Sequence, residues 1–328
     1  MSAWHMDAEL VGRTHDGEMI THYTLSHNGL VRATFSNFGA SLVSLVTPDR
    51  HGERSNIALT LASAKDYWDP ARNTHALGAT LGRFSRCVPH GRLQLDGCLY
   101  SLSINEACHH FHGGPTGFSR RVWRATGSSV SEPAIHFFLE SPDSDQGYPG
   151  NLQAKVTYAF PSWDTLSITY DVSCDRTTLA GLCNHTYWNL AGTDDVNGHL
   201  LEVAADFIVG ADADHLPDGS FVSVAGSTLD FRQETHIGAT RIDHCFCVQS
   251  GHRQARLRHP PTGRYLDIVT DQPALAVHTG DSLPLPRQGI ALQTTALPYY
   301  PKIPFNDAIL PAGTSRRHST VYKFGCFV

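Results

Sequence analysis

Short segments in which apolar and polar residues alternate recur along the whole chain. Successive side chains of a β-strand point to opposite faces, so a period of two residues is typical of strands with one buried face. The clearest of these segments are Val31–Phe35, Ile135–Glu140, Ala154–Phe160, Thr165–Val172, Leu200–Val209 and Leu275–His278. The pattern predicts a protein built mainly from strands.

Residues that favour turns separate these segments. The turn clusters are Pro48–Gly52, Leu95–Gly97, Asp143–Gly150 and Asp194–Gly198. The chain shows no long segment with the helical period of 3.6 residues, which argues against helices that connect parallel strands. One short helix is expected over Ala62–Tyr67, opened by Ser63. We therefore expect an all-β fold, a large antiparallel β-sandwich, with a single domain over residues 1–328.

Composition and charge narrow the classes of function. Of the 328 residues, 41% are hydrophobic, which is ample for a sizeable core. The net charge is −6 and the basic residues form no cluster, so we expect no nucleic-acid partner. The chain has neither a basic and apolar leader nor a run of about eighteen apolar residues, which predicts a cytoplasmic protein without a membrane partner. The expected partner is a small-molecule substrate, bound by a monomer or homodimer.

The eight cysteines predict neither disulfides nor a metal site. They are too sparse for a disulfide scaffold and none forms a C-x-x-C pair, so we expect reduced thiols. The spacing of Cys245 and Cys247 fits alternation on a strand better than the spacing of zinc ligands. We interpret His109 and His110 as loop residues, and we expect no metal and no organic cofactor.

Four segments combine polar side chains with glycines in a way that core packing does not require. They are Gly82–Gly91 (GRFSRCVPHG), Phe111–Gly117 (FHGGPTG), Asn184–Gly192 (NHTYWNLAG) and Gly289–Pro298 (GIALQTTALP). In this order they resemble segments of the aldose 1-epimerase (galactose mutarotase) family, and the resemblance covers nearly the whole chain. It implies the galactose mutarotase-like supersandwich fold.

The resemblance also implies a chemistry. Members of this family interconvert the anomers of an aldose by opening and reclosing its ring, which takes a base at the anomeric hydroxyl and an acid at the ring oxygen. The family's acid histidine matches His185, its second histidine matches His112, and its sugar-contacting aspartate matches Asp243. We predict that His185 and His112 are catalytic and that Asp243 binds substrate. The alternatives are histidines satisfied by backbone groups and a carboxylate that caps a turn.

The strand that carries the family's catalytic base departs from the family pattern. The family's glutamate, in a strand that reads roughly C-L-E-T-Q, is Gln293 here. An amide can orient a substrate through hydrogen bonds, but it has no group of useful basicity. We therefore expect Gln293 to bind substrate and ordinary sugar mutarotation to be impaired.

Other substrate-binding positions differ as well. Arg83 keeps its register, whereas the family's Asn-Arg pair that follows is replaced by Arg86 and Cys87. The family's glutamine and tyrosine on a later strand are Ala276 and His278. All five positions are predicted to line the substrate site of a divergent family member with an altered active site.

Strand alternation extends this prediction, because residues two apart share a face. Three sets then share faces: Ala276 with His278; Asp243 with Cys245 and Cys247; and Gln293 with Ala291 and Thr295. Small and soft side chains thus replace hydrogen-bonding ones, which predicts a less polar pocket than a monosaccharide site. His278 as a substitute base and Cys87 as a nucleophile are further hypotheses. The alternatives are a partly exposed strand histidine and an inert, buried thiol.

Three functions follow from these residues. The first is an aldose 1-epimerase-type isomerase in which His185 is the acid and His112 polarises a cyclic hemiacetal. The second is a repurposed scaffold that catalyses a cyclisation, dehydration or isomerisation in specialised metabolism, with the two histidines supplying both proton transfers. The third is a carbohydrate-binding module without catalysis.

Overall fold

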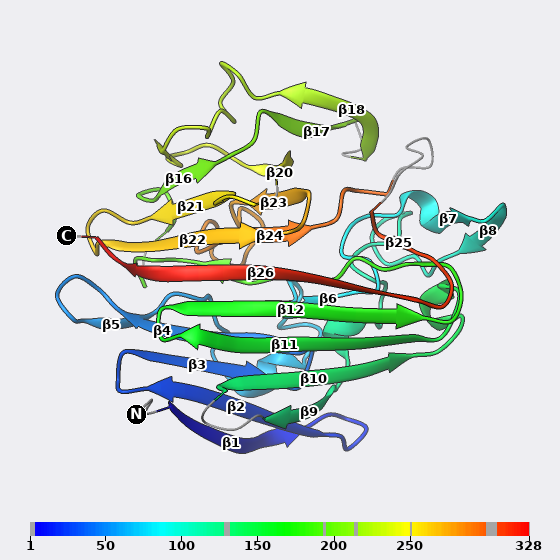
Figure 1. Cartoon of the computed structure of the whole chain (residues 1–328), viewed down its shortest axis with the longest axis horizontal. Coiled ribbons are helices and arrows are strands. Elements are labelled where there is room, and N and C mark those ends of the chain that lie inside the picture. Colours follow the sequence, from blue (N-terminus) through cyan, green and yellow to red (C-terminus); the bar gives the residue numbers. More distant parts are fainter. Residues whose placement is uncertain are drawn as a thin grey trace.

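Antiparallel sheets make up the protein. A computed structural model describes residues 4–127, 132–192, 195–212, 216–249, 251–299 and 307–327. Two large sheets and one five-stranded sheet dominate the described residues, and no pair of adjacent strands within these three sheets runs parallel (Figure 1). The all-β, antiparallel fold is therefore confirmed.

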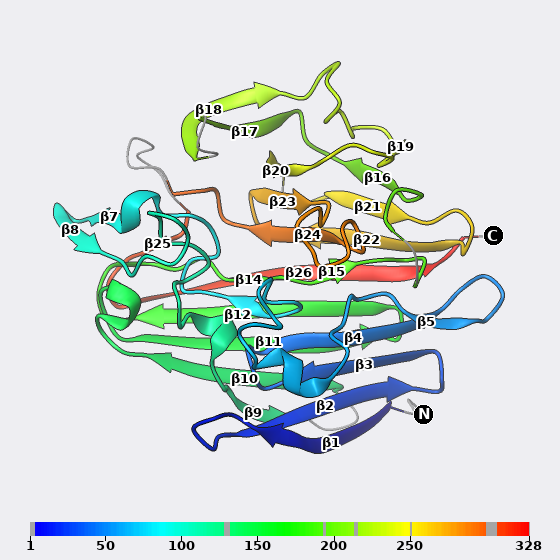
Figure 2. The same ribbon diagram turned by 180° about the vertical axis from the view of Figure 1, so that it is seen from behind.

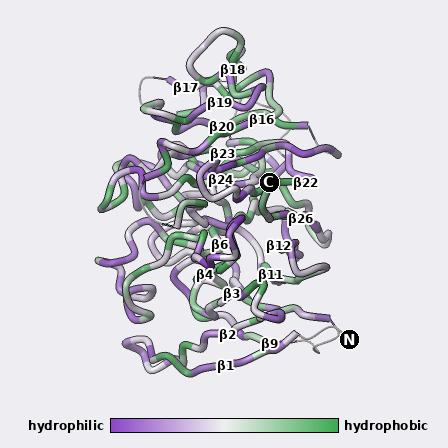
Figure 3. Tube along the Cα trace, turned by 90° about the vertical axis from the view of Figure 1, so that its left-hand side faces the viewer, coloured by the Kyte–Doolittle hydropathy of each residue, from purple (hydrophilic) through white to green (hydrophobic). Residues whose placement is uncertain are grey.

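The largest sheet has nine strands in the order β19-β16-β21-β22-β26-β12-β11-β10-β9. Its strands are β9 (Arg124–Gly127), β10 (Ala134–Ser141), β11 (Leu152–Ser162), β12 (Thr165–Cys174), β16 (Leu200–Val203), β19 (Thr235–His236), β21 (Ala255–Arg258), β22 (Arg264–Thr270) and β26 (Thr314–Cys326). Burial alternates strictly along β12, as the period of two predicts. In the side view, hydrophobic and hydrophilic stretches alternate along the tube (Figure 3).

Two further sheets lie on one side of the nine-stranded sheet (Figure 2). The five-stranded sheet contains β1 (Trp4–Arg13), β2 (Met19–His27), β3 (Val31–Ser36), β4 (Ser41–Pro48) and β5 (Arg54–Asn56). The six-stranded sheet contains, in spatial order, β15 (Tyr187–Trp188), β24 (Ile290–Thr295), β23 (Ala274–His278), β20 (Asp243–Cys247), β17 (Phe207–Ala211) and β18 (Pro217–Ser223).

Short elements complete the fold. Paired short strands are β6 (Thr80–Leu81) with β14 (Cys183–Asn184), β7 (Arg92–Leu95) with β8 (Cys98–Ser101), and β13 (Thr178–Leu179) with β25 (Ile309–Leu310). Four 3₁₀ helices are described: η1 (Ala64–Tyr67), η2 (Pro89–Gly91), η3 (Phe118–Arg120) and η4 (Asp145–Gly147). None of the helices in the described part of the chain has the length and apolar character of a membrane span.

One hydrophobic core joins the three sheets. Phe35 of β3 packs against Tyr158 of β11 with ring centroids 4.7 Å apart, and Val277 and Leu292 of the six-stranded sheet belong to the same cluster. Burying each such side chain contributes about 1.5–3 kcal/mol. A shared core is what the prediction of a single domain over residues 1–328 requires.

Two element predictions were wrong in detail. The expected strand Leu200–Val209 is split into β16 and β17, which belong to different sheets, because the chain leaves the nine-stranded sheet after Val203. The expected helix Ala62–Tyr67 is a 3₁₀ helix that begins at Ala64, preceded by Ser63 without a side-chain cap. In the expected turn Asp194–Gly198, Asp194 lies outside the described residues.

Candidate active site

Three adjacent strands, β20, β23 and β24, align the predicted site residues in rows. The antiparallel register places Cys245 beside Ala276, and Ala276 beside Gln293. In the next row on the same face, Asp243 lies opposite His278 and His278 opposite Ala291. The shared faces expected from alternation are therefore present, and small side chains separate Gln293 from Cys245.

His185 lies between β14 and β15, where the backbone holds it on both sides. Its N–H donates to the carbonyl of Ala79 at 2.8 Å, and its carbonyl accepts from the N–H of Gly78 at 2.9 Å. The Asn184 side chain donates to the Gly78 carbonyl at 2.7 Å and accepts from the N–H of Thr186 at 3.0 Å. The asparagine that precedes the histidine in NHTYWNLAG thus fixes the local backbone.

His112 occupies a loop whose glycines permit close packing. Gly113 has a φ of +89°, and a Cβ atom at this position would lie 1.7 Å from the carbonyl oxygen of Gly82. Only glycine meets both conditions, because other residues rarely adopt this φ and would collide with the backbone. The glycine after the histidine in FHGG therefore lets the loop press His112 against the Gly82–Gly91 segment.

The rings of His112 and His185 meet edge to face. Their centroids are 5.3 Å apart at an interplanar angle of 80°. The His185 ring also lies 5.1 Å from the Tyr187 ring, which in turn contacts the His278 ring edge to face at 6.1 Å. The predicted catalytic histidines are thus neighbours, and Tyr187 contacts the rings of both His185 and His278.

His75 is a further histidine here that the sequence interpretation missed. Electrostatic interactions connect its ring with those of His278 and His185. It lies outside the four glycine-rich segments, three residues before Gly78, so its sequence context carried no signal. We name His75, His112, His185 and His278 the histidine cluster.

Burial keeps the two central imidazoles uncharged. Burial, with smaller contributions from the nearby rings of His278 and His75 and from the charge of Arg86, lowers the pKa of His185 to about 3. Burial also lowers the pKa of His112 well below its usual value, with His185 as the next largest cause. Each ring therefore carries one proton at neutral pH.

The position of that proton on His112 follows from its partner. The Nδ1 atom lies 2.6 Å from the carbonyl oxygen of Ser85. A carbonyl can only accept, so Nδ1 carries the proton and Nε2 presents a lone pair. Among the described residues this Nε2 has no hydrogen-bond partner, and neither has the buried Nδ1 of His185.

Gln293 lies in the middle of β24, where its side chain faces Cys183, two residues before His185. Its side chain is 4% exposed, and the thiol of Cys183 lies 4.0 Å from its Oε1 atom. One row further along the strand, the hydroxyls of Thr295 and Ser85 are 3.1 Å apart, next to the carbonyl that holds His112. The amide of Gln293 thus stands where the family has a carboxylate, and β24 carries no charged side chain.

The hypothesis that His278 serves as a substitute base was wrong. Its Nδ1 atom accepts the backbone N–H of Gly280 at 3.0 Å. The proton of the neutral ring therefore resides on Nε2, which lies 3.9 Å from an Asp243 oxygen. His278 can donate a hydrogen bond from Nε2, but it has no free lone pair to take a proton. The Asp243 side chain is 71% exposed and free to contact a ligand.

The prediction that Arg83 binds substrate was also wrong. Its side chain is buried, and its guanidinium donates to Ser141 Oγ at 2.8 Å and to the carbonyls of Pro149 and Gly150 at 3.0 and 2.9 Å. Further donations to Ser141, Pro142 and Thr178 use its remaining N–H groups. No donor is left for a substrate, because a guanidinium has five N–H groups.

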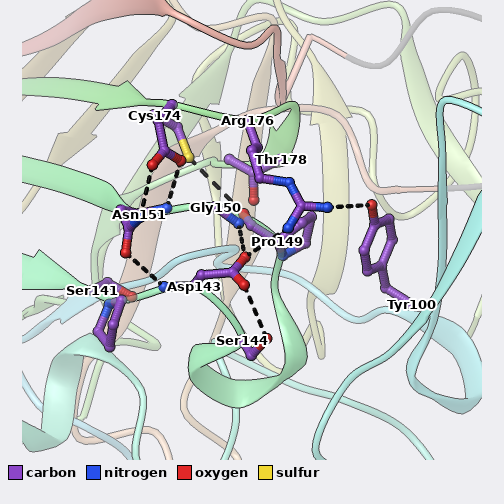
Figure 4. Close-up of polar contacts among 12 residues, drawn as sticks. Tyr100, Ser141, Asp143, Ser144, Pro149, Gly150, Asn151, Cys174, Arg176 and Thr178 are labelled. Carbon is purple, nitrogen blue, oxygen red and sulfur yellow. Dashed lines mark hydrogen bonds and ion pairs between the residues drawn. The ribbon is translucent and has the colours of Figure 1, made fainter.

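The turn that Arg83 holds is itself a dense polar network (Figure 4). Asp143 accepts from the N–H of Gly150 at 2.5 Å and from Arg176 at 3.1 Å, and Arg176 also reaches the Tyr100 hydroxyl. Surface depressions of about 400 and 470 Å³ lie beside this network and over β11, β12 and β26. No residue of the histidine cluster lines either depression.

Arg86 and Cys87 differ from Arg83 in their exposure. Both are half-buried, and Arg86 makes no hydrogen bond to another described residue. Its charge acts on the rings of His112 and His185. Burial raises the pKa of the Cys87 thiol to about 11, which outweighs the opposing effect of Arg86. The thiol is therefore protonated at neutral pH, contrary to the hypothesis of a nucleophile.

Comparisons with known proteins point to one family. The family model described as Aldose 1-epimerase matches residues 21–323. The chain is similar to galactose mutarotase of Mus musculus, with 31% identity over 88% of this chain and 89% of the relative. It is similar to aldose 1-epimerase of Escherichia coli, with 31% identity over 94% of this chain and 96% of the relative. The crystal structure of galactose 1-epimerase from Lactobacillus acidophilus superposes with a TM-score of 0.87 and 25% identity, covering 99% of this chain and 100% of the other.

Proposed function

This chain belongs to the aldose 1-epimerase family, and from that membership we propose that it opens and recloses a cyclic hemiacetal by proton transfers at His112 and His185. The observation that carries the proposal is the edge-to-face pair of these rings, whose centroids are 5.3 Å apart, together with the lone pair that His112 keeps on Nε2. Relatives named galactose mutarotase and aldose 1-epimerase support an isomerase that acts on sugars.

The reaction needs two complementary proton transfers. As the ring opens, a base takes the proton of the anomeric hydroxyl while an acid protonates the ring oxygen, and the roles reverse on closure. His112 Nε2 has the lone pair that such a base requires, because Nδ1 is committed to the Ser85 carbonyl. His185, which carries one ring proton, is the donor for the ring oxygen. The pair therefore supplies both functions without a carboxylate.

Gln293 makes this chemistry slow. A carboxylate at this position would accept a proton, and its charge would also raise the pKa of the neighbouring histidines. The amide does neither, and the rings stay neutral with the pKa of His185 near 3. A base with a strongly lowered pKa is a weak one, so we expect catalysis about 10²–10⁴-fold below that of a site with a positioned carboxylate.

The small residues on the β20–β23–β24 face bear on the substrate. Cys245, Ala276 and Ala291 offer little hydrogen bonding, while His278 Nε2–H, the Gln293 amide and the exposed Asp243 carboxylate are polar groups of this face. Arg86, whose charge acts on the rings of His112 and His185, is a further predicted contact. We propose a hemiacetal with fewer hydroxyl contacts than a hexose. Asp243 and Cys87 stay predicted contacts at the edge of this face.

Anomer exchange measured by NMR tests the proposal. Purified protein is added to α-galactose and to a deoxy-sugar hemiacetal, and exchange above the buffer rate is quantified. We expect weak but measurable catalysis that the variants His185→Ala and His112→Ala abolish. Equal exchange in wild type and both variants, with unchanged circular dichroism, would overturn the proposal.

Gln293→Glu provides the matched gain of function. The carboxylate restores a base at the family's position on β24, so we expect anomer exchange to rise by about 10²–10⁴-fold. Sugar binding without turnover in both wild type and Gln293→Glu would instead indicate a carbohydrate-binding module. Turnover of a non-sugar metabolite that needs both histidines would indicate the repurposed scaffold.

A further inference from the structure

A second cluster of ligating side chains lies on the loops next to His112. His90 belongs to η2, while Cys108 and His109 belong to the loop that leads to His112. The two segments pair at Val88 and His110, whose backbones exchange hydrogen bonds of 2.8 and 3.2 Å. Nothing in the local sequence spacing resembles a metal motif, because the pairing of the loops brings the ligands together.

The ligand atoms are close enough to share one ion. One nitrogen from each histidine and the Cys108 sulfur lie within 4.8 Å of one another, and Cys108 Sγ is 3.3 Å from His109 Nε2. In a tetrahedral zinc site, with bonds of about 2.3 Å to sulfur and 2.0 Å to nitrogen, ligand atoms are roughly 3.5 Å apart. His109 Nδ1 accepts the backbone N–H of His90 at 3.1 Å without the metal. An ion at Nε2 would replace this hydrogen bond, because a neutral imidazole that coordinates through Nε2 keeps its proton on Nδ1.

We propose that His90, Cys108 and His109 bind a divalent transition metal of the zinc type, with water as the fourth ligand. A thiolate with two imidazoles favours zinc over calcium or magnesium, which prefer oxygen ligands. His90 and Cys108 are exposed, so an ion reaches the site from solvent. On binding, the Cys108 thiol releases its proton and the sulfur coordinates as a thiolate.

The site adjoins the histidine cluster through both of its segments. The segment of His90 begins near Ser85, whose carbonyl accepts from His112, and the segment of Cys108 ends at His112 itself. An ion bound by His90, Cys108 and His109 joins these two segments away from the hydrogen bond between His112 and Ser85. Its role is therefore to fix the loop that carries His112, without taking part in the proton transfers.

Cobalt titration of the metal-free full chain tests the site. Cobalt(II) substitutes for zinc, and a cobalt–thiolate bond gives an intense charge-transfer band. We expect the band to saturate at one equivalent and zinc to displace it. Cys108→Ser should abolish the band, and His90→Ala should weaken binding by more than about 100-fold, above the ~10–100-fold cost of losing an outer-shell partner.

Matched variants separate this site from other ligands of the chain. Cys98→Ser removes another exposed cysteine and His51→Ala another exposed histidine, and both should bind cobalt as wild type does. Saturating zinc should raise the melting temperature of wild type by roughly 3–6 °C and leave that of Cys108→Ser unchanged. No thiolate band in wild type, or equal cobalt affinity in Cys108→Ser, would overturn the proposal.

Discussion

His110 and His112 are two residues apart on one loop, yet their ring nitrogens are used differently. His110 donates from Nδ1 to the Ser103 carbonyl at 2.6 Å and pairs through Nε2 with the Tyr148 hydroxyl at 2.7 Å. His112 makes the same kind of bond from Nδ1 to Ser85 but leaves Nε2 free among the described residues. Burial lowers the pKa of both, to about 4 for His110. An unused nitrogen, and not a shifted pKa, distinguishes the candidate catalytic histidine.

The two arginines of the Gly82–Gly91 segment repeat this contrast. The guanidinium of Arg83 donates all of its N–H groups to the 141–150 turn and to Thr178. Arg86 has no hydrogen-bond partner among the described residues. Both carry the same charge in the same motif. The difference teaches that a match to a motif identifies the segment, while the contacts decide which side chain is available to a ligand.

Replacing each loop histidine by leucine should separate the two roles. His112→Leu removes the proposed base, so we expect anomer exchange to fall by about 10²–10⁴-fold. His110→Leu removes one hydrogen-bond partner from the buried Tyr148 hydroxyl and one from the Ser103 carbonyl, so we expect a loss of about 2–5 kcal/mol in unfolding free energy. Exchange rates and urea unfolding are measured on both variants. A His110→Leu protein that is stable but inactive would contradict the assignment of a structural role to His110 and a catalytic role to His112.

The arginine pair should separate in the same way. Arg83→Met leaves several buried carbonyls unpaired, and we expect the unfolding free energy to drop by about 3–5 kcal/mol. Arg86→Met should change stability by less than about 1 kcal/mol and raise KM roughly tenfold, through loss of one charged hydrogen bond to substrate. Urea unfolding and steady-state kinetics provide the readouts. Equal destabilisation by both changes would show that Arg86 is structural too.

The free energy of unfolding should depend on pH through the satisfied histidines. Unfolded His110 takes up a proton near pH 6.5, whereas burial lowers the pKa of the folded residue to about 4. The unfolded state therefore binds more protons between these values, and stability falls as pH is lowered through this window. The stability difference between wild type and His110→Leu should shrink by about 1.4 kcal/mol per unit between pH 6 and pH 5. A difference that stays constant over this range would contradict the assignment.

Substitution of Cys87 is expected to have the smallest effect on the rate of anomer exchange. Because burial raises the pKa of its thiol to about 11, only about one molecule in a thousand is a thiolate at pH 8. Cys87→Ser should leave anomer exchange within about twofold of wild type. Alkylation at pH 8, followed by mass spectrometry, should label exposed Cys98 well before Cys87. Rapid labelling of Cys87 would revive the hypothesis of a nucleophile.

The strand pattern and the motifs could be read from the sequence alone. Alternation is a local property, so β3, β10, β11 and β12 fall where the sequence predicts them. The motif segments carried the family, because strings such as NHTYWNLAG hold glycines and asparagines that the backbone needs. They also located His112, His185 and Gln293, and the register then placed Gln293 beside Ala276 as alternation required.

Only the tertiary structure decided which partners these side chains meet. The split of Leu200–Val209 between two sheets, the enclosure of Arg83 and the bond from Gly280 to His278 depend on hydrogen bonds whose donors and acceptors no periodicity specifies. The same holds for His75, which reaches the cluster from outside every motif. Sequence period fixes the direction of a side chain, but the availability of its polar atoms is set by segments distant along the chain.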